Sequence, residues 1–283
     1  MILPTWLSMR HNYQISLISD STGETLDRIF LALKSQFSNF KYEKKEYVFV
    51  RTEKQIDKII EESEGIKNSI ILYTIVETKL AKYISNKLKK KKIPCFSILG
   101  NLILNFSKLL NQKATHTPSA QHVLNEEYYK RIEAIQFSIE HDDGMHIEDI
   151  KDADIILLGV SRTSKTPTSI YLGNRGYKTL NIPLVGSQEI PSMLEKNPDN
   201  FFIVGLNVEA ERLSDIRANR LEAMKDDKTT NYSSLDFIRE EIENSKRLFQ
   251  KYSWPTIDVT RKSVEETAAS IIRIFDIKKR KKK

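Results

Sequence analysis

The stretch that decides the fold is Asp154-Ile155-Ile156-Leu157-Leu158-Gly159-Val160-Ser161-Arg162-Thr163-Ser164-Lys165-Thr166. An apolar run typical of a buried strand leads into a polar turn and then into a helix start that carries Lys and Thr. This is the context that a Walker A loop requires, because backbone N–H groups and the positive helix end can hold a chain of phosphates. The stretch therefore predicts a phosphate loop in an α/β sheet.

The residues predicted to bind a nucleotide are the eight of the loop: Gly159, Val160, Ser161, Arg162, Thr163, Ser164, Lys165 and Thr166. Lys165 would neutralise the terminal phosphate oxygens, and the Thr166 hydroxyl could ligate Mg²⁺. Ser164 stands where a Walker A loop has its second glycine, so either serine accepts the loop conformation or the loop has a different shape. A polar strand-to-helix turn without a ligand is the structural alternative.

Strands and helices alternate along the whole chain, which indicates parallel sheets covered by helices. Strands are predicted at 13–19, 47–50, 69–75, 94–98, 155–158, 178–183, 201–206 and 256–259. A break at 141–144 suggests a boundary near residue 150. We expect a parallel-sheet α/β domain over 1–150, a P-loop-kinase-like α/β domain over 151–277 and a disordered basic tail at 278–283.

Composition excludes several classes of protein. The chain has 283 residues and a net charge of +7, but the six cationic residues of 278–283 supply most of that excess, so we expect no nucleic-acid partner. No apolar run is long enough to span a bilayer, and residues 1–10 do not resemble a signal peptide. Cys95 is the only cysteine, which excludes an internal disulfide and a cysteine-based zinc site and favours a reducing, cytoplasmic location.

Two carboxylates are candidates for catalysis. Asp20 follows the first predicted strand, at the end where active-site carboxylates of α/β sheets gather. Asp258 lies at the tip of the last predicted strand. Structural alternatives exist near both, because Ser21 with Glu24, and Ser263 with Glu266, have the spacing of helix capping boxes.

Further polar residues have weaker patterns. Arg212, Arg217 and Arg220 could form a mobile lid over a transferred phosphoryl group, although solvated helix arginines are common. His141, Asp142, Asp143 and His146 have the residue types of metal ligands, but they surround Gly144 in what we interpret as a turn at the domain junction, so no metal site is predicted there.

Together these motifs resemble the bifunctional kinase/pyrophosphorylase family that regulates pyruvate, phosphate dikinase and, in a sister branch, phosphoenolpyruvate synthetase. The matching segments are 18–25, 141–144, 159–171, 174–177, 212–213 with 216–217, and 257–260 with 263–268. They span almost the whole chain in order. Ser164-Lys165-Thr166 and Ile257-Asp258-Val259-Thr260 resemble the dikinase branch, in which serine at the second glycine position is expected.

The resemblance implies two opposed reactions. ADP would donate its β-phosphate to a threonine of the dikinase and leave AMP, and inorganic phosphate would attack the phosphothreonine to give pyrophosphate. Catalytic roles are expected for Lys165, with Asp20 or Asp258 orienting the threonine hydroxyl, and Mg²⁺ is the expected cation. The sequence leaves the oligomeric state open, a homodimer included.

Three other functions remain possible from the sequence. The chain could act on the synthetase, or it could be a small-molecule P-loop kinase that uses ATP. A basic nucleic-acid-binding module is the alternative from a different class.

Overall fold

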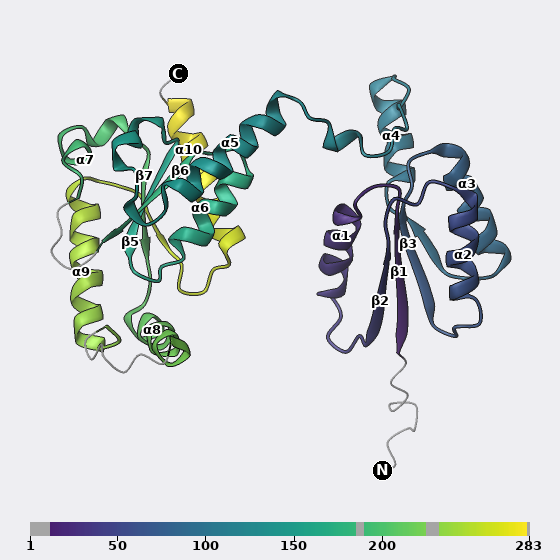
Figure 1. Cartoon of the computed structure of the whole chain (residues 1–283), viewed down its shortest axis with the longest axis horizontal. Helices are drawn as coiled ribbons and strands as arrows, with labels where there is room; N and C mark the ends of the chain where they lie inside the picture. Colours follow the sequence, from purple (N-terminus) through teal and green to yellow (C-terminus); the bar gives the residue numbers. More distant parts are fainter. Residues whose placement is uncertain (1–11, 185–189, 225–231, 282–283) are drawn as a thin grey trace, which may run out of the picture. The chain divides into compact units, whose positions relative to one another are not determined.

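The structure, a computed structural model, describes residues 12–184, 190–224 and 232–281 and divides the chain into two compact units (Figure 1). Unit 1 is Met1–Val123 and unit 2 is Leu124–Lys283. Each unit contains a four-stranded sheet in which every pairing is parallel, so the predicted α/β class is confirmed. None of the helices in the described ranges combines the length and hydrophobicity needed to cross a membrane.

The division between the units falls earlier than the boundary near residue 150 that we expected. Helix α5 (Glu126–Glu140) packs on helix α6 (Lys165–Asn174) and so belongs to unit 2. The two helices are so close that a Cβ on Gly173 would lie 3.1 Å from the carbonyl oxygen of Ala134. The sequence did not indicate this contact, because charged residues interrupt the apolar pattern of α5.

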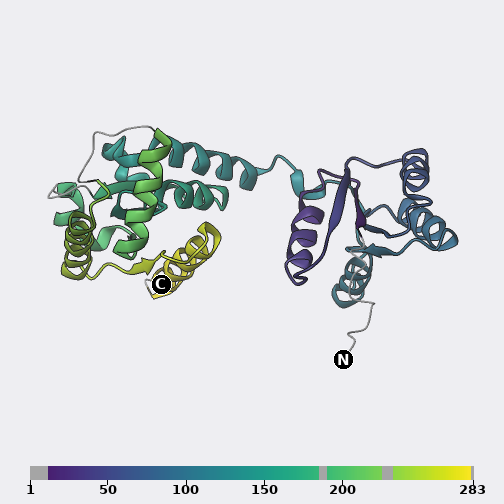
Figure 2. The same cartoon turned by 90° about the horizontal axis from the view of Figure 1, so that it is seen from below.

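Unit 1 has the strand order β2-β1-β3-β4, with β1 at Tyr13–Ser19, β2 at Tyr42–Tyr47, β3 at Ser69–Thr74 and β4 at Cys95–Ser97. Alternate residues of β1 and β3 face opposite sides of this sheet. Ile15, Leu17 and Leu72 pack against α1 (Glu24–Lys34). Ile18, Ile71 and Tyr73 pack against α2 (Glu53–Ser63) and α3 (Thr78–Lys90). Figures 1 and 2 show these helices on the two faces.

Two elements of unit 1 differ from the prediction. The strand expected at 47–50 lies at Tyr42–Tyr47 instead. The prediction missed its position because this edge strand is polar and largely exposed, and the apolar residues come after it. Helix α4 (Gly100–Leu110) was not predicted, since its apolar residues do not define one buried face; no residue of this helix is buried.

Unit 2 has the strand order β6-β5-β7-β8, with β5 at Ile155–Val160, β6 at Thr179–Leu184, β7 at Ile203–Asn207 and β8 at Thr256–Asp258. Its remaining α-helices are α7 (Ser192–Lys196), α8 (Ala210–Met224), α9 (Leu235–Lys251) and α10 (Val264–Lys281). The chain leaves β5 for β6 on one side and later adds β7 on the other side. The carboxyl end of β5 is therefore the point where strand order reverses, which is where open α/β sheets bind ligands.

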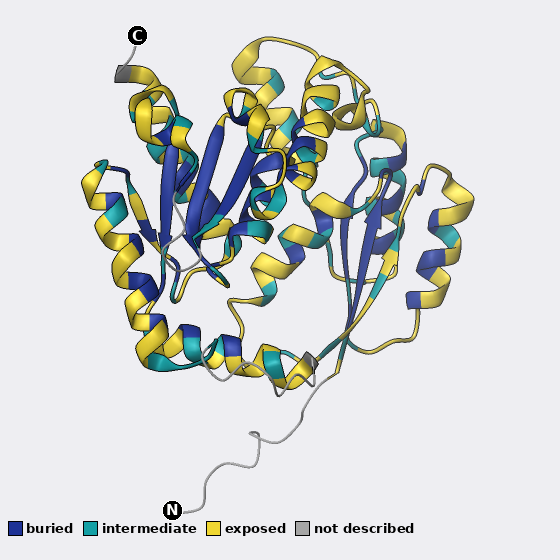
Figure 3. Cartoon of the chain, turned by 60° about the vertical axis from the view of Figure 1, so that its left-hand side comes forward, coloured by how far each residue is buried: buried dark blue, intermediate teal, exposed yellow. Residues whose placement is uncertain are grey.

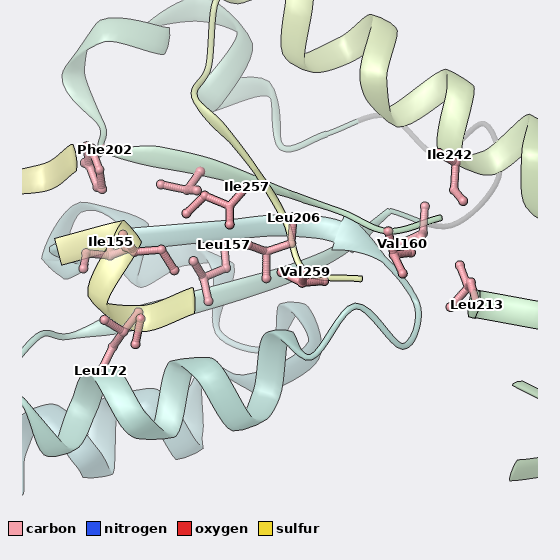
Figure 4. Close-up of a cluster of buried hydrophobic side chains, with 14 of the residues drawn as sticks. Ile155, Leu157, Val160, Leu172, Phe202, Leu206, Leu213, Ile242, Ile257 and Val259 are labelled. Atoms are coloured by element: carbon pink, nitrogen blue, oxygen red, sulfur yellow. The ribbon is translucent and has the colours of Figure 1, made fainter. Parts of the chain in front are cut away.

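The core of unit 2 lies on both faces of its sheet. Ile155 and Leu157 point toward Leu172 of α6 and Ile271 of α10, in the cluster shown in Figure 4. Ile156 and Leu158 face the other cluster, which includes residues of α9, α7 and α5. Every residue of β5 is buried, and Figure 3 shows the central strands in dark blue between helices with exposed outer sides. The loop after β5 therefore starts from a rigid support.

The chain ends differently from the expectation. Helix α10 continues to Lys281, so the prediction of a disordered tail is wrong for residues 278–281. The Lys278 ammonium donates a hydrogen bond to the carbonyl of Phe201 at 3.2 Å, which ties the helix to the unit. Lys282, Lys283 and residues 1–9 lie outside the described residues.

The two predicted capping boxes have different outcomes. Ser263 and Glu266 exchange hydrogen bonds between each side chain and the other's N–H, at 3.2 and 2.8 Å, so this box is confirmed. The box predicted for Ser21 and Glu24 is wrong, because the residue that caps α1 is Gly23, in a left-handed conformation and without a side-chain cap.

Gly205→Ala tests how closely α9 packs on β7. A Cβ on Gly205 would lie 2.6–2.7 Å from ring atoms of Phe249, so we expect a loss of about 1–3 kcal/mol in the free energy of unfolding of unit 2. Urea denaturation measures this loss. The double variant Gly205→Ala/Phe249→Leu should lose less than the two single losses added together, because the smaller side chain relieves the clash. Strictly additive losses would contradict the contact.

Candidate active site

The loop after β5 has the shape of a phosphate cradle. Gly159 has no room for a side chain, because a Cβ would lie 2.7 Å from Thr163 Oγ1 and 2.9 Å from the Leu206 carbonyl oxygen. Arg162 and Ser164 adopt φ angles of 72° and 60°, in the left-handed region that non-glycine residues rarely occupy. Serine thus accepts the conformation that a Walker A glycine usually adopts. Helix α6 begins directly afterwards, so its free N–H groups face the loop.

Lys165 is the chemical centre of this loop. Its side chain is only 5% exposed, and its ammonium group donates a hydrogen bond to the Val160 carbonyl at 3.0 Å. Burial lowers the pKa of Lys165 to about 8, although the charges of Asp143 and Asp142 oppose the shift. The loop therefore holds a buried cation whose hydrogen-bond partner is a neutral carbonyl, and such a cation suits a phosphate oxygen.

A second segment reaches the loop from before β5. Asp142, in the short 3₁₀ turn Asp142–Gly144, accepts a hydrogen bond from Thr166 Oγ1 at 2.9 Å. The same carboxylate oxygen accepts from the side-chain amide of Asn181 on β6. Asn181 is fully buried, and its carbonyl oxygen accepts from the Asp143 N–H at 3.0 Å. The turn is thus part of the loop's surroundings.

The sequence indicated a turn in this segment, which we placed at a domain junction. The hydrogen bonds that join this turn to the loop region were therefore not predicted. The His141 ring stacks on Phe137, its Nδ1 donates to the Phe137 carbonyl at 2.8 Å, and its Nε2 lies 3.4 Å from Asp149 Oδ2. The signal that could have revealed the contact is Asn181, a polar residue inside a buried strand. Such a side chain needs polar partners, and the structure supplies them in the Asp142 carboxylate and the Asp143 N–H.

Arg217 supports the loop from behind. The arginine is fully buried and pairs with Glu241 of α9 at 2.7 Å. It also donates to the carbonyls of Ser161, at 3.2 Å, and Tyr232, at 3.1 Å. A mobile lid role therefore does not fit Arg217, whereas Arg212 and Arg220 are exposed on α8.

Tyr232 connects this support to the front of the loop. Its ring lies over the Arg217 guanidinium, and its hydroxyl lies 3.2 Å from Ser161 Oγ and 3.3 Å from Arg162 Nε. Burial alone would raise the pKa of Tyr232, but these hydrogen bonds and the arginine charges lower it. The contact of Tyr232 with the loop was not predicted, because no local sequence pattern indicates it.

The two carboxylates predicted to be catalytic each accept hydrogen bonds within their own unit. Asp258 accepts hydrogen bonds from the hydroxyl and N–H of Thr260, at 2.6 and 2.9 Å, and these bonds lower the pKa of Asp258. It lines a cavity of about 810 Å³ together with Asn207 and Lys246. Asp258 is thus oriented toward its own turn.

Asp20 belongs to unit 1, at the carboxyl end of β1. Its carboxylate accepts from the Val76 N–H at 2.7 Å and lines a cavity of about 290 Å³ with Ser19, Ser21 and Thr74. Burial raises the pKa of Asp20, against the lowering effect of the Val76 N–H and the Arg51 charge. It stands at the carboxyl end of β1, as predicted, where the strand order of unit 1 reverses.

Unit 2 is thus an α/β domain in which a buried lysine, a loop with two left-handed residues and two adjacent aspartates form a site that suits phosphate. The family model for kinase/pyrophosphorylases matches residues 15–272, so the chain belongs to this family.

Near full-length relatives carry one provisional name, pyruvate, phosphate dikinase regulatory protein. The chain is 66% identical to such a protein of Pelagibacter ubique over 271 residues, which cover 96% of this chain and 99% of the relative. It is 41% identical to a relative from Bradyrhizobium diazoefficiens, over 95% and 96% of the two chains. For a relative from Maricaulis maris the identity is 42%, over 93% of each chain.

Lys165→Met tests the buried ammonium group. In the folded protein Lys165 releases its proton near pH 8, whereas the unfolded chain keeps it to about 10.5. The unfolded state thus binds more protons between these values, so wild-type stability relative to the variant rises with pH there. At ~1.4 kcal/mol per pKa unit, the rise is on the order of 3 kcal/mol.

Urea denaturation between pH 7.5 and 10.5 measures this difference. Lys130→Met, which removes an exposed lysine of α5, is the matched control and should show no such rise. Parallel pH profiles for wild type and Lys165→Met would overturn the assignment of a lowered pKa.

Proposed function

We propose that this chain regulates pyruvate, phosphate dikinase by moving a phosphoryl group between ADP and a threonine of that enzyme. In the forward direction ADP is the donor and AMP is released. In the reverse direction inorganic phosphate attacks the phosphothreonine, so that pyrophosphate forms and the threonine is restored. The names of the relatives and the family support this choice of target and chemistry.

The observation that carries the proposal is the buried Lys165 ammonium within the loop Gly159–Thr166. Phosphoryl transfer depends mainly on positioning and on neutralising charge, and a preorganised cation with backbone donors supplies both. The loop residues would bind the ADP phosphates, and Lys165 would exchange its bond to the Val160 carbonyl for a phosphate oxygen. The same cradle suits inorganic phosphate in the reverse reaction. Mg²⁺ fits as the accompanying cation, because Thr166 offers a hydroxyl oxygen to it.

Asp143 is the best candidate for the carboxylate that handles the threonine proton. It is exposed, its charge acts on Lys165, and it lies beside the aspartate that contacts Thr166. In the forward reaction the threonine oxygen would bond to the β-phosphorus as the bond to the AMP oxygen breaks. The hydroxyl proton would pass to Asp143 and return in the reverse reaction. This role replaces the ones that the sequence suggested for Asp20 and Asp258.

Incubation of the chain with the dikinase and ADP tests the donor. We expect one AMP per phosphothreonine formed, measured by nucleotide chromatography and phosphosite mass spectrometry, and little reaction with ATP. Lys165→Met should lose both products, because a lost charge-assisted contact costs about 1.5–3 kcal/mol or more. Release of ADP from ATP in step with phosphorylation would identify an ordinary kinase instead.

Asp143→Asn tests the proton acceptor. General acid–base catalysis is typically worth about 10²–10⁴-fold, so both directions should slow by such a factor in kcat. ADP affinity, measured by calorimetry, should change little. Glu148→Gln removes an exposed carboxylate a few residues away and is the control. A kcat for Asp143→Asn close to that of wild type would assign the proton to another group.

A further inference from the structure

Phosphate loops of this type usually bind Mg²⁺ through the Ser or Thr after the lysine and through an aspartate of the Walker B segment. In unit 2 the strand β7, which pairs with β5, ends in Asn207 rather than in an aspartate. The Asn207 side chain is a neutral amide, and its buried Oδ1 lacks a hydrogen-bond partner within the described residues. The usual position therefore supplies no negative charge.

A carboxylate reaches the loop threonine from the opposite side of β5. Asp142 Oδ1 lies 2.9 Å from Thr166 Oγ1, on a turn that packs against β6. A loop hydroxyl and a carboxylate oxygen are thus already adjacent, and these are the two types of ligand that phosphate loops use for one cation. The residue that carries this carboxylate, Asp142, precedes β5 in the chain, whereas a Walker B aspartate follows the phosphate loop.

Asn181 fixes the position of Asp142. Its amide nitrogen donates to Asp142 Oδ1, and its amide oxygen accepts from the Asp143 N–H, so both ends of the side chain hold the turn. Asn181 is fully buried in β6, which pairs with β5 along six residues. Asn181 thus ties the Asp142 carboxylate to the sheet, beside Thr166 of α6.

We propose that Asp142 and Thr166 form the protein's part of a Mg²⁺ site, with Asn181 as the residue that positions Asp142. The proposal deepens the proposed function and rests on it, since nucleotide phosphates would supply further oxygen ligands. Mg²⁺ commonly binds through one or two carboxylates plus substrate phosphates and keeps several waters. Within the described ranges no three His, Cys, Asp or Glu side chains gather into a metal-binding group, so a cation here would take the rest of its ligands from phosphates and water.

Calorimetry of ADP binding to the full chain, with excess EDTA and then with saturating Mg²⁺, tests the site. For wild type we expect Mg²⁺ to increase ADP affinity on the order of tenfold, a usual size for coupling between two ligands. Asp142→Asn should still bind ADP without Mg²⁺, so that the effect of the cation on its ADP affinity can be measured. Mg²⁺ should raise the ADP affinity of this variant by about twofold or less, which is below the usual size of coupling between two ligands.

Two further variants guard against a purely structural effect. Thr166→Ser keeps a hydroxyl and should keep most of the Mg²⁺ gain, whereas Thr166→Val should lose it. Asp149→Asn removes a carboxylate of the same segment that contacts His141, and it should behave as wild type.

The outcomes separate the two proposals. Absence of ADP binding to wild type under both conditions would overturn the proposed function. A wild type that binds ADP, together with an Asp142→Asn variant that retains the full Mg²⁺ gain, would overturn the cation site and leave Asp142 as a structural partner of Thr166.

Discussion

The burial of one ammonium group is the constraint on which unit 2 depends. Lys165 follows a strand without a single exposed residue, and an isolated buried charge is costly. The Val160 carbonyl and the charges of two aspartates reduce that cost without forming a direct ion pair. The lysine therefore stays charged near neutral pH while remaining free to exchange its carbonyl partner for a phosphate. A close carboxylate partner would stabilise the fold further but would compete with that ligand.

A second buried charge stabilises the loop that holds the first. Arg217 and Glu241 join α8 to α9, and Arg217 Nη2 and Nη1 donate to the carbonyls of Ser161 and Tyr232. Two loop residues adopt left-handed conformations that cost about 1–3 kcal/mol each, and such strain persists only where surrounding contacts determine the geometry. Breaking this buried pair would leave an uncompensated charge directly beneath the loop. The shape of the phosphate cradle thus depends on residues that never touch a ligand.

Sequence predicted the features that are local. The apolar run before Gly159 and the lysine after it predicted β5, the loop and α6, because each follows from a few adjacent residues. The edge strand β2 was misplaced because its polar residues lack the alternation of a half-buried strand. The contacts of Asp142, Asn181 and Tyr232 join residues 24 to 71 positions apart, and no spacing rule connects them.

The wide sequence span of the cradle has a consequence for synthesis of the protein. Unit 1 ends at Val123, so its sheet can close while the rest is still being translated, as domains generally fold in order from the N-terminus. The phosphate loop emerges next, but Glu241 and the strand β8 come roughly 75 or more residues later, at about 5–20 residues per second of elongation. At that rate the nascent chain carries Arg217 without Glu241, 24 residues later, for about 1–5 seconds, and β7 remains longer without β8. During this interval the growing chain depends on water, or on chaperones, to cover what α9 and β8 later bury.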